Sequence, residues 1–99
     1  MRNVLVEYVY TGNEEPWQQL IADFLNAVEA DARLAGRFHY QVFSMPEGRK
    51  VHIGRWDTDE TLKTLQSQAF FKTFAEGIKG FAGDSLKSGF GNEVFSTGQ

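Results

Sequence analysis

The residues of this chain best suited to chemistry are a histidine and a group of aromatic side chains with polar tips. His52 could accept or relay a proton, because the ordinary pKa of histidine lies nearest to neutral pH. Tyrosine and tryptophan join an apolar body to a hydrogen-bonding tip, so several on one face are typical of a ligand pocket as well as of ordinary core. The candidate ligand-contacting residues are Tyr8, Tyr40, Trp56, Asn92, Phe70 and Phe74.

Each candidate also has a purely structural interpretation. His52 could be a hydrogen-bonded histidine of the core or its rim. Asn92 could orient a carbonyl or phenol group of a ligand, or it could satisfy backbone groups. Gly54 lies between His52 and Trp56 in the sequence. A glycine between two large side chains leaves space that a ligand could fill, and this favours a site near His52.

Metal, thiol and nucleotide chemistry are not expected. His39 and His52 have opposite parity in extended segments, so they cannot hold one ion within a subunit. The chain has no cysteine, which excludes disulfides and thiolate nucleophiles. Gly89-Phe90-Gly91-Asn92 is rich in glycine, but no helix follows it to bind phosphate. We interpret these glycines as a β-bulge and expect no cofactor.

Composition restricts the class of protein. The 99 residues, 41% hydrophobic and 14% aromatic, can bury a core, and we expect one domain over residues 1–99. A net charge of −3 offers no basic face for nucleic acid. Met1–Glu7 reaches a charge too early for a signal peptide, and no run approaches the roughly 18 apolar residues of a membrane span. These features favour a cytoplasmic protein without membrane contact.

The residue pattern predicts the order β-α-β-β-α-β. Asn13 is a candidate helix cap, Pro46-Glu47-Gly48 a turn, and Ser67-Gln68-Ala69 the site of a kink. This order indicates a ferredoxin-like α+β fold, a four-stranded antiparallel sheet with two helices on one face. The predicted strands cover residues 4–10, 38–45, 51–56 and 86–95, and the predicted helices cover residues 14–34 and about 58–81.

Alternation along the strands predicts two apolar sheet faces. The even positions should lie under the helices; they are Val4, Val6, Tyr8, Tyr10, Phe38, Tyr40, Val42, His52, Trp56, Leu86, Phe90 and Val94. The odd positions include Leu5, Val9, Phe43, Met45, Val51, Ile53 and Phe95. This second face is too apolar to remain in water, so we expect a homodimer with stacked sheets, in which Glu7 and Arg55 meet across neighbouring strands. The alternative is a mixed, solvated sheet surface.

The third strand and second helix together resemble the antibiotic biosynthesis monooxygenase family of dimeric α/β barrels. The matching segments are Val51-His52-Ile53-Gly54-Arg55-Trp56-Asp57-Thr58, Leu62, Phe70-Phe71-Lys72 and Glu76-Gly77-Ile78-Lys79-Gly80. With the element order, the resemblance spans nearly the whole chain. It implies a dimeric barrel with a pocket between sheet and helices in each subunit. Members include oxygenases of phenols or quinols that need no metal or flavin, haem-degrading relatives, and proteins of no known activity.

Four positions depart from the family pattern. The histidine that ligates haem in some members would align with Ala75, and their pocket asparagine with Tyr8. Haem degradation is therefore not expected. A histidine common in other members aligns with Phe70, and an acidic residue before the tryptophan is replaced by Gly54.

Two functions follow as hypotheses. The first is a cofactor-independent monooxygenase that oxidises a small aromatic or quinol-type substrate with O2. In it His52 is the base or proton relay, and the other candidates position the substrate. The alternative is a non-catalytic dimeric protein that binds or senses a small hydrophobic molecule.

Overall fold

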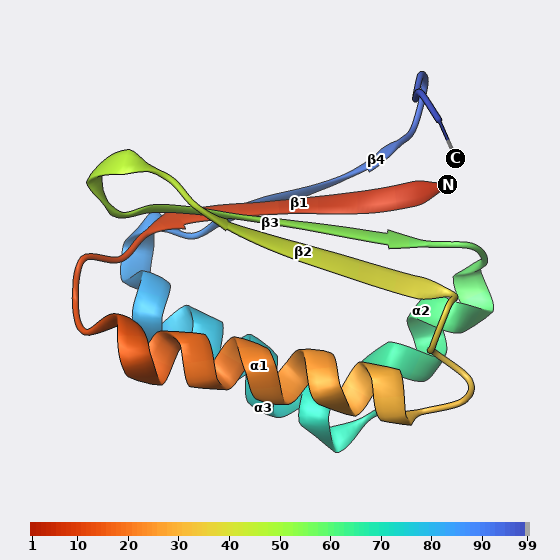
Figure 1. Ribbon diagram of the computed structural model, residues 1–99, viewed down its shortest axis with the longest axis horizontal. Coiled ribbons are helices and arrows are strands. Elements are labelled where there is room, and N and C mark those ends of the chain that lie inside the picture. The colour runs from red at the N-terminus through yellow and green to blue at the C-terminus, as the bar shows by residue number, and fades with distance from the viewer. Residues whose placement is uncertain (99) are drawn as a thin grey trace.

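In the computed structural model, which describes residues 1–98, a four-stranded sheet forms one layer and the helices form the other (Figure 1). The sheet order is β2-β3-β1-β4, and all neighbouring strands are antiparallel. The predicted ferredoxin-like α+β fold is therefore confirmed. The strands are β1 (Arg2–Val9), β2 (Phe38–Ser44), β3 (Arg49–Trp56) and β4 (Lys87–Asn92), and the α-helices are α1 (Glu14–Ala30), α2 (Asp59–Gln66) and α3 (Ala69–Ala82).

The first helix begins where predicted and ends earlier. The Asn13 side chain accepts a hydrogen bond from the Glu15 backbone N–H at 3.0 Å, which caps α1. The helix stops at Ala30 rather than near residue 34, because Asp31 is extended and its side chain accepts from the backbone N–H and guanidinium of Arg33. These local bonds compete with further helical hydrogen bonds. No helix within residues 1–98 is long and apolar enough to cross a membrane.

The predicted kink in the second helical region is confirmed as a complete break between α2 and α3. The Thr58 side chain accepts from the Thr61 backbone N–H at 3.3 Å and caps α2. At the other end of α2, the side chains of Ser67 and Gln68 donate to the Thr64 carbonyl at 2.7 and 2.9 Å. These bonds satisfy a carbonyl left free at the helix end, and α3 starts in a new direction.

The last strand is shorter and more regular than predicted. It pairs with β1 one residue to one, from Glu7 with Lys87 to Arg2 with Asn92, so the predicted bulge is wrong. A bulge requires two residues opposite one, and no extra residue occurs here. Val94 lies beyond β4 and is exposed, so its predicted place under the helices is also wrong.

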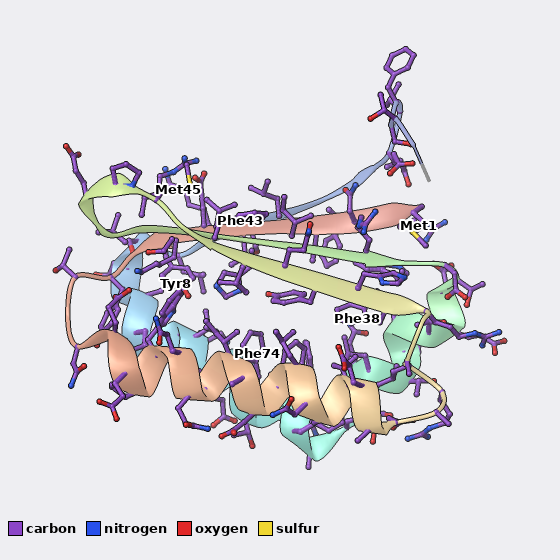
Figure 2. The ribbon with its side chains drawn as sticks, in the orientation of Figure 1. Met1, Tyr8, Phe38, Phe43, Met45 and Phe74 are labelled. Atoms are coloured by element: carbon purple, nitrogen blue, oxygen red, sulfur yellow. The ribbon has the colours of Figure 1, made fainter. Side chains whose placement is uncertain are left out.

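The inner face of the sheet otherwise follows the predicted parity. Tyr8, Phe38, His52 and Trp56 are buried, and Figure 2 shows Tyr8 and Phe38 between the sheet and the helices. Phe90 departs from this pattern because β4 is exposed along its whole length at the sheet edge, which leaves the Phe90 side chain 71% exposed.

The outer face of the sheet carries exposed apolar side chains. Leu5, Val9, Phe43 and Met45 are 41–50% exposed, and Figure 2 shows Phe43 and Met45 on the side of the sheet away from the helices. The predicted pair of Glu7 with Arg55 is wrong. The strand register places Arg55 opposite Asn3, and Glu7 instead forms an ion pair of 2.8 Å with Arg49.

Candidate active site

A cavity of about 230 Å³, here called the main cavity, lies between the inner face of the sheet and the three helices. Its volume exceeds the roughly 150 Å³ that holds benzene in an engineered core, and it falls below the roughly 300 Å³ at which pockets for drug-sized ligands begin. A molecule of one or two rings would fit. Three predicted ligand-contacting residues, Tyr40, Trp56 and Phe74, line this cavity.

The other predicted site residues lie around this cavity rather than on its wall. His52 is fully buried, and Tyr8 lies behind the wall with it. Phe70 lines a smaller cavity with Leu20. Asn92 lines an opening near the end of β4, and Trp56, Leu62 and Phe90 border both this opening and the main cavity.

A continuous chain of hydrogen bonds runs behind the cavity. The Trp17 indole N–H donates to the Tyr8 hydroxyl at 2.7 Å. The Tyr8 hydroxyl lies 2.7 Å from His52 Nε2, and the Tyr40 hydroxyl lies 2.8 Å from His52 Nδ1. Of the four side chains in this hydrogen-bond chain, Tyr40 alone lines the main cavity. Chemistry at His52 would therefore reach a ligand through Tyr40.

Burial keeps the titratable members of this hydrogen-bond chain, His52, Tyr8 and Tyr40, neutral near pH 7. Loss of water lowers the pKa of His52 to about 4. Burial raises the pKa of Tyr8 to about 12, and the hydrogen bond from Trp17 opposes this increase. The pKa of Tyr40 is also raised, first by burial and then by the nearby Tyr8. The site can therefore donate neutral hydrogen bonds, while the imidazole is a weak base.

The space predicted beside Gly54 is filled by the protein itself. A Cβ atom at Gly54 would lie 3.0 Å from Tyr40 Cδ1 and 3.1 Å from Val4 Cγ1. Tyr40 and Val4 are also the residues directly opposite Gly54 on the two neighbouring strands. The absence of a side chain at Gly54 therefore allows the Tyr40 ring to pack against the sheet, and the prediction of ligand space at that point is wrong.

The indole N–H of Trp56, a residue that lines the cavity, is a buried donor. Trp56 is 2% exposed, and its Nε1 has no hydrogen-bond partner among residues 1–98. An unsatisfied buried donor costs about 1–3 kcal/mol. No group of three possible metal ligands gathers in the part of the chain that the structure describes.

Comparison with solved structures identifies the fold. No family model and no curated protein sequence matches the chain. SnoaB, a cofactor-independent oxygenase from Streptomyces nogalater, superposes with a TM-score of 0.76 at 10% identity, over 99% of this chain and 97% of its own. A Caulobacter crescentus protein provisionally described as an antibiotic biosynthesis monooxygenase gives a TM-score of 0.77 at 14% identity, over 95% and 90% of the two chains. This chain has the antibiotic biosynthesis monooxygenase fold.

The same fold occurs in a Nitrosomonas europaea protein with the same provisional description, at a TM-score of 0.75 and 10% identity, over 96% of this chain and 100% of that one. The predicted resemblance to the antibiotic biosynthesis monooxygenases is therefore confirmed for the fold. Within this fold, the cavity between sheet and helices lies where the resemblance implies a pocket.

Two buried residues beside the cavity of this antibiotic biosynthesis monooxygenase fold were not predicted from the sequence. They are Trp17, which begins the hydrogen-bond chain, and Lys50, which contacts it. Trp17 lies in the predicted helix of residues 14–34 and is not among the candidate site residues. Lys50 is 2% exposed, and its ammonium group lies 4.2 Å from the centre of the Trp17 ring. Lys50 was overlooked because β3 was predicted to start at residue 51, whereas it starts at Arg49. An earlier start would have placed Lys50 on the inner face by parity.

Proposed function

We propose that this protein is a cofactor-independent monooxygenase that oxidises a small aromatic or quinol-type molecule with O2 in the main cavity. The observation that carries this proposal is Tyr40, which lines an otherwise mostly apolar cavity and whose neutral hydroxyl is hydrogen-bonded to His52. Support comes from the fold, which is shared with SnoaB. In such a reaction the substrate supplies all four electrons, one oxygen atom enters the product, and the other leaves as water.

The protein would contribute three things to this reaction. An apolar cavity excludes water and strengthens the hydrogen bonds inside it. The Tyr40 hydroxyl would hold the oxygen of an ionised phenol, in the manner of an oxyanion hole. His52 would act on the substrate only through Tyr40, because its imidazole is hydrogen-bonded to the Tyr40 hydroxyl and does not line the cavity.

Oxygen uptake with a panel of quinols tests the proposal. Tyr40→Phe should lower the rate about tenfold, the effect of losing one hydrogen bond of about 1.4 kcal/mol. Tyr10→Phe is the matched control, because the Tyr10 hydroxyl donates to the Asn13 carbonyl outside the main cavity and its loss should leave the rate unchanged. Absence of uptake from every quinol with the unaltered protein would reject the oxygenase function.

A non-catalytic binding protein is the second candidate. The observation that favours it is the position of His52, which lies off the cavity wall and has a pKa of about 4. A binding protein would hold a small hydrophobic molecule without converting it. Mass spectrometry of the protein as purified, under native and then denaturing conditions, would detect such a retained molecule. A retained molecule that is unchanged after incubation with O2 favours this function over oxygenation.

We also propose that the protein acts as a homodimer formed through the outer face of the sheet. That face carries four exposed apolar side chains, and exposed patches of this kind commonly mark interfaces. In a face-to-face arrangement, a charge placed at Phe43 would be buried without a partner. Phe43→Glu should therefore convert the dimer to a single subunit of 11.2 kDa.

Sedimentation equilibrium at micromolar concentration measures this change. Gln18→Glu is the control, because it adds the same charge at an exposed position of α1 and should leave the dimer intact. A single subunit in the unaltered protein would contradict the proposed dimer.

A further inference from the structure

We infer that Trp17 determines which ring nitrogen of His52 carries the hydrogen, and that it thereby makes Tyr40 a hydrogen-bond donor toward the cavity. An indole N–H can donate but cannot accept. Since it lies 2.7 Å from the Tyr8 hydroxyl, the Tyr8 oxygen must be the acceptor of that bond. The single hydrogen of Tyr8 then remains for its other neighbour, His52 Nε2, at 2.7 Å.

The opposite arrangement leaves a buried donor unsatisfied. If His52 Nε2 carried the hydrogen, the Tyr8 oxygen would accept two hydrogen bonds. Its own hydrogen would then have no acceptor among residues 1–98, although Tyr8 is almost completely buried. Leaving a buried donor unpaired is unfavourable. In the form with hydrogen on Nδ1, the unpaired hydrogen instead belongs to Tyr40, which is less buried than Tyr8 and lines the main cavity. The bond network therefore favours the form of His52 with hydrogen on Nδ1.

With the hydrogen on Nδ1, every hydrogen bond from Trp17 to Tyr40 is donated toward the cavity. His52 Nδ1 then donates to the Tyr40 hydroxyl at 2.8 Å. Because the Tyr40 oxygen is the acceptor in that bond, the Tyr40 hydrogen is free for another acceptor. Tyr40 lines the main cavity, so a ligand there would meet a donor. Three hydrogen bonds thus run in one direction, from Trp17 to Tyr8, from Tyr8 to His52 and from His52 to Tyr40.

A buried lysine holds Trp17, the first residue of the hydrogen-bond chain, in place. The Lys50 ammonium donates to Glu14 at 2.7 Å and to Ser44 at 2.8 Å, and it lies 4.2 Å from the centre of the Trp17 ring. A cation over an indole face is attracted to the ring and restricts its orientation. Glu14 and Trp17 are one turn apart on α1, so the same lysine fixes both the helix start and the indole.

This direction of donation predicts which class of ligand the cavity binds. The cavity should prefer a one- or two-ring molecule with an accepting oxygen, such as a carbonyl or an ionised phenol, because a ligand that can only donate would leave the Tyr40 hydrogen unpaired. This part of the inference rests on the proposed function, which places an aromatic ligand in the cavity. Trp17 would be a positioning residue, because it acts on the ligand only through Tyr8, His52 and Tyr40.

The hydrogen position on His52 can be measured without any ligand. Long-range proton–nitrogen NMR spectra of protein labelled with 15N-histidine distinguish the two neutral forms of the ring. The unaltered protein at pH 7 should show His52 with hydrogen on Nδ1, and the opposite form would overturn the inference. In Trp17→Phe, the His52 signals should shift toward a mixture of the two forms, while His39 reports whether the protein is folded.

A second variant protects this test against a folding failure. Tyr8→Phe removes the oxygen that links the indole to the imidazole, and it should also shift His52 away from the Nδ1–H form. If either folded variant retains the pure Nδ1–H form, Trp17 does not set the hydrogen position and the inference is wrong.

Binding of a matched pair of probes tests the ligand class. 1-Tetralone and tetralin share a two-ring skeleton and differ in one carbonyl oxygen. By calorimetry, the preference of the unaltered protein for 1-tetralone should fall about three- to tenfold in Trp17→Phe, the factor that one neutral hydrogen bond contributes. An unchanged preference contradicts the assigned ligand class. If neither probe binds, the proposed ligand cavity fails, and the NMR result still decides the role of Trp17.

Discussion

Phe24→Ala should lower the free energy of unfolding by about 3–5 kcal/mol. The Phe24 ring is 2% exposed and stacks on Phe74 with ring centres 3.9 Å apart. It also lies within 6.4 Å, centre to centre, of the rings of Phe38 and Tyr40. Truncation would remove these contacts and leave a void, since α1 is held in place by its other buried residues and cannot collapse onto the sheet.

Urea denaturation followed by circular dichroism measures this loss, and the melting temperature should fall by roughly 12 °C or more. Gln18→Ala, at an exposed position of the same helix, is the control and should stay within about 0.5 kcal/mol of the unaltered protein. A loss below about 1 kcal/mol for Phe24→Ala would show that the helices can repack, and it would contradict a rigid layer between sheet and helices. Because Phe24 also lines the cavity, the variant should bind larger probes.

Acid should destabilise the protein by about 3 kcal/mol between pH 6.5 and pH 4 through His52 alone. Burial lowers the pKa of His52 in the folded state to about 4, from an ordinary value of 6.5. Above pH 6.5 the imidazole is neutral in both the folded and unfolded states, and the full stability is present. As the pH falls below 6.5, the unfolded chain binds the proton first, so unfolding becomes progressively more favourable until the folded state also binds it near pH 4.

Urea denaturation at pH 7 and pH 4.5 measures this dependence. His52→Gln removes the titrating group but keeps a donor and an acceptor for Tyr8 and Tyr40, so its stability should change little between the two pH values. His39→Gln, at the other histidine, should retain the full dependence. Equal stability of the unaltered protein at both pH values would contradict a buried neutral His52. The carboxyl groups of Asp31 and Asp57 titrate lower, because hydrogen bonds hold their pKa values below the ordinary 3.8.

The two predictions concern the same part of the molecule. Phe24 packs against the Tyr40 ring, and Tyr40 bonds His52. The apolar packing that excludes water from His52 is therefore also what lowers its pKa. A loss of packing at Phe24 should admit water and reduce the acid sensitivity, so the double variant Phe24→Ala/His52→Gln should show non-additive stability changes.

Sequence patterns predicted the helix start and the helix break correctly where these depend on hydrogen bonds between residues close in the sequence. The cap at Asn13 and the break at residues 67–69 depend on side chains bonding to backbone groups a few residues away. Local signals were weaker where several conformations compete. The end of α1 and the predicted bulge in β4 were wrong, because the turn at Asp31 and the one-to-one pairing with β1 depend on partners that periodicity does not reveal.

By itself, the sequence determined the order of the elements and the face on which most strand residues lie, because the period of two in a strand is a property of the backbone. Only the tertiary structure decided how deep each inward side chain lies and which neighbour it bonds. Tyr40 reaches the cavity while His52 and Tyr8 do not, and Lys50 is buried beside Trp17. The physical reason is that these contacts join residues 9 to 44 positions apart in the chain, and strand register and helix packing bring them together.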